Sequence, residues 1–283
     1  MSLNSVNTNL NAAIALQSLN RTSSQLAATQ KTISTGYRVA DAADDGAAYA
    51  VAQRVRSDVG ALGSANQQLG NVKGLISTTI TGLNAASNTL KEAREILVKL
   101  GDSNTQGDQR TQYVAQYQSK LANVKTFLQD AGYNNKSLIG NITGSNGTFG
   151  SVAVIRNEVG ATYGIATFGG SAFFASVNFT STALGSAASV QALITAAGTF
   201  LNALSTLGSK LNTYGSAVNY VDNQISYNND KIDSLNGGLG SLIDADLAKE
   251  SAKLQALQIR QQLGTQALSI ANQAPQSLLS LFK

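Results

Sequence analysis

Apolar residues recur at every seventh position through much of the first half of the chain. The repeat consists of Val55, Leu62, Leu69, Ile76, Leu83, Leu90 and Leu97. Three residues after most of these positions lie Ala65, Val72, Ala86, Ala93 and Leu100. A seven-residue apolar repeat of this length predicts a helix whose apolar stripe packs along a partner helix. At about 1.5 Å per residue, this helix would be about 65 Å long.

A second long stripe lies in the C-terminal half and alternates steps of three and four residues. Its members are Val190, Leu193, Ala197, Phe200, Leu204, Leu207, Leu211, Tyr214, Val218, Val221, Ile225, Asn228, Ile232 and Leu235. Only Asn228 is polar. A single polar residue in such a seam favours a role in fixing helix register over a ligand site. The matching lengths of the two stripes predict that the two helices pack together.

A third, shorter helix is predicted by Val114, Tyr117, Leu121, Val124, Leu128 and Ala131. The turn-rich segment 101–108 separates it from the first helix, so the two should form an antiparallel hairpin against the long C-terminal helix. Residues 132–135 (GYNN) predict its C-terminal cap.

Between Thr148 and Thr180 the apolar period changes from helical spacing to alternation. The alternating positions are Val152 and Val154, then Tyr163 and Ile165, then Ala175, Val177 and Phe179. Glycine-containing turns separate the three groups. This pattern predicts two or three short antiparallel strands, in an insertion too short to form a large separate domain.

Both chain ends have amphipathic helical patterns. The N-terminal positions are Leu3, Val6, Leu10 and Ala13, continued on a shifted track by Leu16, Leu19, Leu26 and Ile33, and Gly36 ends the helix. The C-terminal positions are Leu247, Leu254, Leu257, Leu263, Leu268, Ile270 and Ala271. Residues 236–240 (NGGLG) predict a flexible break before this helix, and residues 241–244 predict its capping box.

An isolated helix of this kind is marginal in water, so we expect the terminal helices to order against other copies of the same protein. A head-to-tail contact generates a filament if it stays open and a ring if it closes. The pattern by itself does not choose between the two.

The predicted fold is mainly α. It is a long antiparallel helical bundle or coiled coil built from both chain ends, with a small β-hairpin insertion in the middle. The expected parts are a terminal helix (1–36), the N-terminal part of the rod (37–140), the β insertion (141–185), the C-terminal rod helix (186–240) and a second terminal helix (241–283).

Composition excludes most catalytic chemistry. The chain is 43% hydrophobic and 13% charged, with no histidine, cysteine or tryptophan. Without histidine and cysteine it lacks the usual zinc ligands and the Ser-His and Cys-His nucleophile pairs. We therefore expect no catalytic, cofactor or metal site and no enzymatic activity. The missing cysteines fit a cytoplasmic protein as well as an exported one without disulfides, and the first residues do not resemble a cleaved leader.

Charge and hydropathy change the picture little. The formal net charge is +4, but lysines and arginines are scattered singly, which favours solvated helix faces over a nucleic-acid patch. The uncharged stretch 159–209 raises the alternative of a type III translocator that inserts into membranes. Polar residues and glycines interrupt it every few positions, so we expect a helix-packing face and no membrane insertion.

The chain resembles the bacterial flagellins at both ends. The opening segment of that family is similar to residues 3–9 (LNSVNTN), 33–39 (ISTGYRV) and 44–48 (DDGAA). Its closing segment is similar to residues 247–255 (LAKESAKLQ) and 262–273 (QLGTQALSIANQ), and residues 132–138 are a looser counterpart of a turn in the family. The resemblance covers residues 1–140 and 190–283. The short middle is most similar to the flagellins of alphaproteobacteria.

This resemblance implies a subunit of the bacterial flagellar filament for swimming motility, exported through the flagellar type III apparatus and located outside the cell. The terminal helices would form an inner tube, the central helices would surround it, and the extra outer domains of long flagellins would be missing. Its partners would be other flagellin copies, hook-associated and cap proteins, and an export chaperone. A hook–filament junction protein is the alternative.

The resemblance and the terminal stripes together predict a polymerisation interface. Its predicted residues are Leu3, Val6, Leu10, Leu16, Leu19, Leu26, Ile33, Arg38, Asp44, Asp45, Leu247, Leu254, Leu257, Leu263, Leu268 and Ile270. Within it we expect Asp41 or Asp44 to cap the next helix and Arg38 to contact another subunit.

In many flagellins an innate-immune receptor recognises the surface that corresponds here to Glu92, Arg94 and Glu95. Glu92 stands where the recognised members have an arginine. The reversed charge predicts weak or absent activation of that receptor.

Overall fold

The computed structural model describes residues 9–140, 142–145, 147–195 and 197–280. The chain forms two compact units. The described parts of 1–57 and 233–283 make the chain-end unit, and those of 58–232 make the rod unit. Most described residues are helical, which confirms the predicted fold class.

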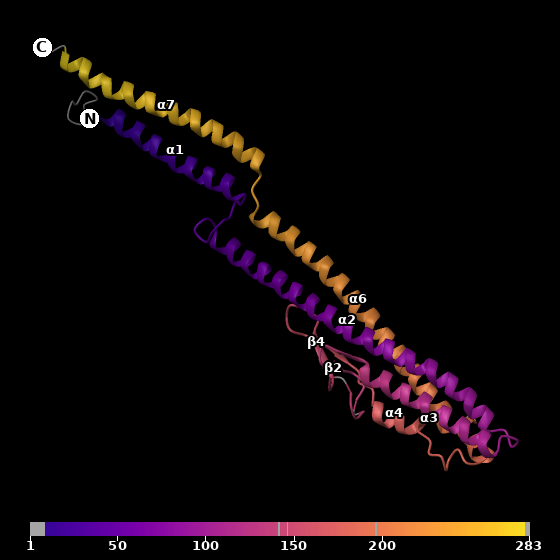
Figure 1. The fold of residues 1–283 in the computed structure, drawn as a ribbon. Coiled ribbons are helices and arrows are strands. Elements are labelled where there is room, and N and C mark those ends of the chain that lie inside the picture. Colours follow the sequence, from indigo (N-terminus) through magenta and orange to yellow (C-terminus); the bar gives the residue numbers. More distant parts are fainter. Residues whose placement is uncertain (1–8, 141, 146, 196, 281–283) are drawn as a thin grey trace. The chain divides into compact units, whose positions relative to one another are not determined.

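The chain-end unit contains an antiparallel pair of helices, α1 (Leu10–Thr35) and α7 (Leu247–Ser280), which lie side by side in Figure 1. Asn9 caps α1 by accepting a hydrogen bond from the amide of Ala12 at 3.0 Å. Gly36 ends the helix in the left-handed conformation, with φ of 74°. The terminal helices therefore pair with each other within one chain.

The same unit contains the start of α2 (Gly46–Leu100) and the end of α6 (Thr199–Ile243). A small core joins them and consists of Val39, Ala48, Ala52 and Ile243, with Tyr49, Leu239 and Leu242 packed against it.

The rod unit is built on α2, α3 (Gly107–Asp130) and α6. Both long stripes are confirmed. Buried residues on α2 include Leu62, Leu69, Ile76, Leu83, Leu90 and Leu97, and those on α6 include Phe200, Leu207, Tyr214, Val221 and Asn228. The α3 residues Tyr117, Leu121, Val124 and Leu128 join the same core.

A small sheet follows α3 and consists of β1 (Gly132–Tyr133), β2 (Lys136–Ser137) and β3 (Thr148–Phe149). β1 pairs with β2 in antiparallel and β2 with β3 in parallel orientation. The predicted helix cap at 132–135 is wrong, because α3 already ends at Asp130. Asn134 and Asn135 have φ of 47° and 58°, the left-handed pair that a two-residue hairpin turn requires.

The next hairpin consists of β4 (Val152–Ile155) and β5 (Thr162–Ile165), which confirms two of the predicted strands. The third predicted strand is wrong, because Ala175 and Val177 lie in α4 (Gly170–Val177). Phe173 and Val177 are four residues apart and both are buried, which is the spacing of one helix face. The apparent alternation of apolar positions arose because small residues lie between them.

The C-terminal stripe is divided between α5 (Ala187–Ile194) and α6. The predicted break at residues 236–240 is wrong, because α6 continues through Gly237 and Gly238 to Ile243. Each helical glycine costs about 1 kcal/mol relative to alanine, and the packing of Leu239, Leu242 and Ile243 in the small core offsets that cost.

The predicted capping box at 241–244 is also wrong. The side chain of Asp246 caps α7, accepting hydrogen bonds from the amides of Ala248 and Lys249 at 3.0 Å each.

Among the described residues, the stretch from Ala187 to Ile243 is long and apolar enough to cross a membrane by length and composition. Core helices of soluble proteins meet the same two criteria, and α6 turns its stripe into the core of the rod unit, so this is weak support for a membrane segment.

Candidate assembly surface at the chain ends

The α1–α7 pair has a regular inner seam. On α1 the partly or fully buried positions at steps of three and four are Ala12, Ala15, Leu19, Thr22, Leu26, Thr29 and Ile33. On α7 the corresponding positions are Glu250, Leu254, Leu257, Gln261, Gly264, Leu268 and Ala271. Leu19 lies against Gly264, and the side chain of Asn9 donates to the carbonyl of Ala271 at 2.7 Å. The spacing is that of a coiled coil.

This inner seam is thin. Thr29 is buried, and its hydroxyl has no hydrogen-bond partner among the described residues. Gly264, Ala12 and Ala15 contribute little apolar area, and Leu257 is the one fully buried leucine of the described seam. Because hydrophobic stabilisation scales with the apolar area removed from water, the other leucines of the seam, which are only partly buried, each contribute less than a fully buried leucine.

A second apolar stripe runs along α7 on a different face. Ile259, Leu263 and Ile270 are 57%, 58% and 68% exposed, and Ala252 and Ala256 continue their spacing of three and four residues. At 3.6 residues per turn, this outer stripe lies about 140° around the helix from the inner seam. α7 therefore carries one apolar face that α1 covers and another that the described part of the chain leaves exposed.

α1 also exposes large apolar side chains, near its start. Leu10, Ile14 and Leu16 are exposed, as is Leu247 at the start of α7. Asn9 bonds to Ala271, so the residues at the start of α1 lie towards the Ile270 end of α7 and Leu247 lies at the opposite end. Exposed apolar side chains mark interaction sites where they are close neighbours.

The apolar residues of the predicted interface separate into three groups, and Arg38, Asp44 and Asp45 lie in the connector between α1 and α2. Leu3 and Val6 lie outside the described residues. The inner seam contains Leu19, Leu26, Ile33, Leu254, Leu257 and Leu268, and the exposed positions are Leu10, Leu16, Leu247, Leu263 and Ile270. Sequence reasoning missed Ile14 and Ile259, although Ile259 lies four residues before Leu263 and therefore shares its face.

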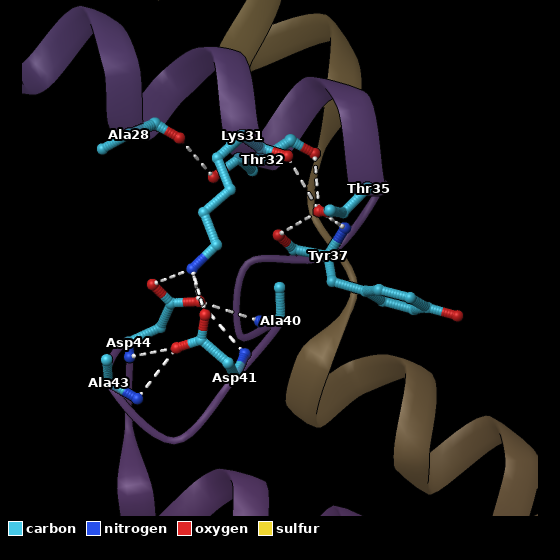
Figure 2. A network of polar contacts seen from close by, with 9 residues as sticks. All are labelled: Ala28, Lys31, Thr32, Thr35, Tyr37, Ala40, Asp41, Ala43 and Asp44. Carbon is cyan, nitrogen blue, oxygen red and sulfur yellow. Dashed lines mark hydrogen bonds and ion pairs between the residues drawn. The ribbon is translucent and has the colours of Figure 1, made fainter.

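The connector between α1 and α2 is held by a charged network (Figure 2). The ammonium of Lys31 lies 2.7 Å from Asp41 and 2.8 Å from Asp44. Each carboxylate also accepts backbone hydrogen bonds, Asp41 from Ala43 at 2.8 Å and Asp44 from Ala40 at 3.0 Å. The hydrogen bonds to Lys31 lower the pKa of Asp41 and of Asp44, and the same contacts raise the pKa of Lys31.

Arg38 joins this connector to the end of α6. Its guanidinium donates to the carbonyl of Leu242, and its amide donates to that of Ile243 at 2.7 Å. The amide of Ala245 donates back to Gly36 at 3.0 Å. The two connectors between the helices are therefore hydrogen-bonded to each other.

The prediction that Asp41 or Asp44 caps α2 is wrong. The cap is Asp45, which accepts from the amides of Ala47 and Ala48 at 3.0 Å each. The helix begins at Gly46, so only the residue directly before it has the geometry of an N-cap.

The three predicted receptor-facing residues lie on the exposed side of α2. Glu92 forms an ion pair with Lys120 of α3 at 2.6 Å, whereas Arg94 and Glu95 extend the exposed surface. Among the described residues, no three or more histidine, cysteine, aspartate or glutamate side chains lie together so that they could hold a metal ion.

Two family models match the chain. The bacterial flagellin N-terminal helical region matches residues 6–143, and the bacterial flagellin C-terminal helical region matches residues 194–282. Flagellin FljM of Caulobacter vibrioides is 33% identical, with all of both chains covered. A flagellin of Brucella melitensis is 34% identical, with 99% of each chain covered.

A solved structure described as a flagellar hook-associated protein from Vibrio parahaemolyticus has a similar fold, with a TM-score of 0.54 at 15% identity. It covers 71% of this chain and 100% of its own. Two matched terminal regions, and relatives similar over their whole length, make this chain a member of the bacterial flagellins, a structural and not an enzymatic family.

Proposed function

We propose that this protein is a structural subunit of the flagellar filament and polymerises through the outer stripe of α7 and the exposed residues at the start of α1. The observation that carries the proposal is the second apolar face of α7. Burying a leucine or isoleucine side chain contributes about 1.5–3 kcal/mol. Ile259, Leu263 and Ile270 are largely exposed in the single chain, so a partner that covers them gains most of that free energy.

Other copies of the same chain are the natural partner. The outer stripe has the same three-four spacing as the inner seam, so it accepts a helix of the same kind. A contact between the outer stripe of one copy and a different face of the next is heterologous, and such contacts build filaments when they do not close. In this proposal Leu10, Leu16, Leu247, Leu263 and Ile270 contact neighbouring copies.

The remaining predicted residues have supporting roles in this proposal. The inner-seam leucines hold α1 against α7, and Arg38, Asp44 and Asp45 hold the connectors. Leu3 and Val6 extend the interface at the start of the chain. The guanidinium of Arg38 is bonded to the end of α6, so Arg38 mainly holds the connector in place. Only the exposed part of its side chain would contact another subunit.

Family membership supports a proposed location and further proposed partners. The proposal places the protein outside the cell in the filament, after export by the flagellar type III apparatus, with hook-associated and cap proteins at the filament ends and an export chaperone inside the cell. Activation of the innate-immune receptor is expected to be weak, since Glu92 presents a carboxylate paired with Lys120.

A hook–filament junction protein is the second candidate, favoured by the fold similarity to a hook-associated protein. Whole-length similarity to flagellins favours the filament. The two candidates differ in their product, because a junction protein by itself should not form long filaments in negative-stain images. A type III translocator should release dye from vesicles, and we expect no release.

The test replaces Ile259 and Leu263 together by aspartate. The inner seam stays intact, so the monomer should keep the helicity of the wild type, while sedimentable polymer should disappear after salting-out. The matched control places aspartate at Gln258 and Gln262, which lie between the two apolar faces of the same helix. Wild-type filaments that form equally well with the Ile259→Asp, Leu263→Asp variant would contradict the proposal.

A further inference from the structure

The apolar stripes of α2 and α6 do not by themselves select one register. Both stripes repeat every seven residues, so sliding α6 by seven residues along α2, about 10 Å, places apolar residues on apolar residues again. A single native register therefore needs contacts that do not repeat with this period.

Three polar contacts between the two helices have this property. The side chain of Asn228 donates to Asn66 at 2.8 Å, and that of Asn66 donates to Asn229 at 2.8 Å. Further along, Lys73 forms an ion pair with Asp222 at 2.6 Å. The helices are antiparallel, so a slip of seven residues would place Asn228 opposite either Val59 or Lys73.

Asn228 is fully buried, which makes its partners important. Its oxygen accepts from Gln224 at 2.9 Å, and its amide nitrogen donates both to Asn66 and to the backbone carbonyl of Arg156 at 3.0 Å. A buried amide that loses such bonds is strongly disfavoured. The hairpin that carries Arg156 also lies beside α2, because its Val152 and Val154 line one cavity with Ala65 of that helix. A slip of α6 along α2 therefore separates Asn228 from Asn66 and, when the hairpin stays on α2, from Arg156.

The contact with Arg156 brings the β4–β5 hairpin into the arrangement. Glu158 in the hairpin loop pairs with Lys231 of α6 at 2.5 Å, and the ring of Tyr163 stacks on that of Tyr220 at 4.0 Å. Val154 on the same hairpin is buried in the core of the rod unit. The hairpin therefore contacts α6 at three separated positions, Tyr220, Asn228 and Lys231.

We propose that Asn228 and the β4–β5 hairpin form a register lock for α2 and α6. The hairpin can lie against α2 and at the same time bond Asn228 and Lys231 of α6 only when Asn228 faces Asn66. Docking of the hairpin therefore stabilises the native register of α2 and α6, and the native register permits docking. When the two helices slip, the hairpin is undocked. This inference concerns the fold of one chain and does not depend on filament formation.

The experiment measures the register directly. The chain has no cysteine, so cysteines at exposed Asn84 on α2 and Ser226 on α6 can carry two spin labels. Pulsed electron paramagnetic resonance of the full chain should give one distance for the wild type. In the Asn228→Leu variant a second population should appear, displaced by about 10 Å.

The matched control is Thr79→Val. Thr79 is also fully buried, but its hydroxyl donates to Leu75 of its own helix at 2.8 Å and so contributes nothing to register. This variant should keep a single distance. If Thr79→Val also produced a second population, loss of any buried polar group would be the cause and the lock would be overturned.

Two further variants keep the proposal testable if Asn228→Leu does not fold. Asn66→Leu removes the partner from the other helix, and Lys231→Met breaks the ion pair with Glu158 in the hairpin loop while leaving Asn228 and Asn66 in place. Both should populate the displaced distance. A single wild-type distance in both variants would mean that apolar packing alone fixes the register.

Discussion

Lys31, in the last turns of α1, places its ammonium group 2.7 Å from a carboxylate oxygen of Asp41, ten residues further along the chain. The same ammonium lies 2.8 Å from Asp44, so a single cation compensates two neighbouring carboxylates (Figure 2). The connector that leads from α1 to α2 is folded around this ion pair.

The first prediction concerns the pH dependence of this connector. Lys31 lowers the pKa of Asp41 and of Asp44 below the ordinary carboxyl pKa of 3.8. The two ionised carboxylates therefore stabilise the fold at a pH above 3.8, and this stabilisation is lost as the pH falls through their lowered pKa values. In Lys31→Met both carboxyl groups should titrate closer to the ordinary value, as followed by carboxyl carbon NMR shifts. Lys249→Met, at an exposed lysine of α7, is the control and should leave both midpoints unchanged. Equal midpoints in Lys31→Met and wild type would contradict the role of Lys31.

The second prediction compares two buried tyrosines. The hydroxyl of Tyr117 donates to the carbonyl of Val177 at 2.6 Å, so Tyr117→Phe should lower the free energy of unfolding by about 1–2 kcal/mol. The hydroxyl of Tyr214 has no partner among the described residues, so Tyr214→Phe should be neutral or stabilising by up to about 1 kcal/mol. Denaturant titrations of both variants give the comparison, and equal losses would contradict it.

Tyr214 also predicts an alkaline effect. Burial raises the pKa of Tyr214 to about 12, so the folded state holds its proton at a pH where the unfolded state has released it. The associated stability is lost as the pH rises from about 10 towards 12. Tyr214→Phe should therefore reduce the loss of thermal stability over this range.

Much of the fold follows from the sequence because burial of apolar residues at fixed spacing dominates long helices. Leu69 and Leu83 were placed correctly by their seven-residue spacing, and Asn228 by being the one polar member of its stripe. Local signals failed where tertiary packing opposed them. Gly237 is helical because Leu239, Leu242 and Ile243 are anchored in a small core, which no local pattern reveals.

The assembly surface was predicted less completely. An apolar residue on a terminal helix can face its partner within the chain or a neighbouring copy, and composition does not separate the two. Leu257 and Leu263 are chemically alike, yet one is buried in the inner seam and the other is exposed. The two residues differ only in the side of α7 on which they lie, because Leu257 faces α1 and Leu263 does not. The sequence identifies that side only once α1 is known to be the partner of α7.

The third prediction uses glycines in equivalent helical settings. A Cβ added at Gly237 or Gly238 meets no atom within 4 Å, so alanine there should stabilise the protein by about 0.5–1 kcal/mol per site. A Cβ at Gly82 would lie 2.6 Å from that of Ala131, where α2 and α3 approach closely. Gly82→Ala should destabilise by about 1–3 kcal/mol. Thermal unfolding of the variants decides the matter. A flexible joint at 237–238 would instead make both alanines destabilising.

The fourth prediction concerns Arg38, whose guanidinium donates to the carbonyl of Leu242 in the last turn of α6. The final carbonyls of a helix have no partner within the helix, and a positive charge there contributes about 0.3–1 kcal/mol. Arg38→Ala should therefore loosen the chain-end unit by a similar amount and weaken polymerisation, while the helicity of the rod unit is unchanged. Arg54→Ala removes the same charge from an exposed position on α2 and should polymerise like the wild type. Sedimentation of polymer and circular dichroism measure the two effects separately. Normal filaments with unchanged heat stability in Arg38→Ala would show that the link between the two connectors contributes nothing to assembly.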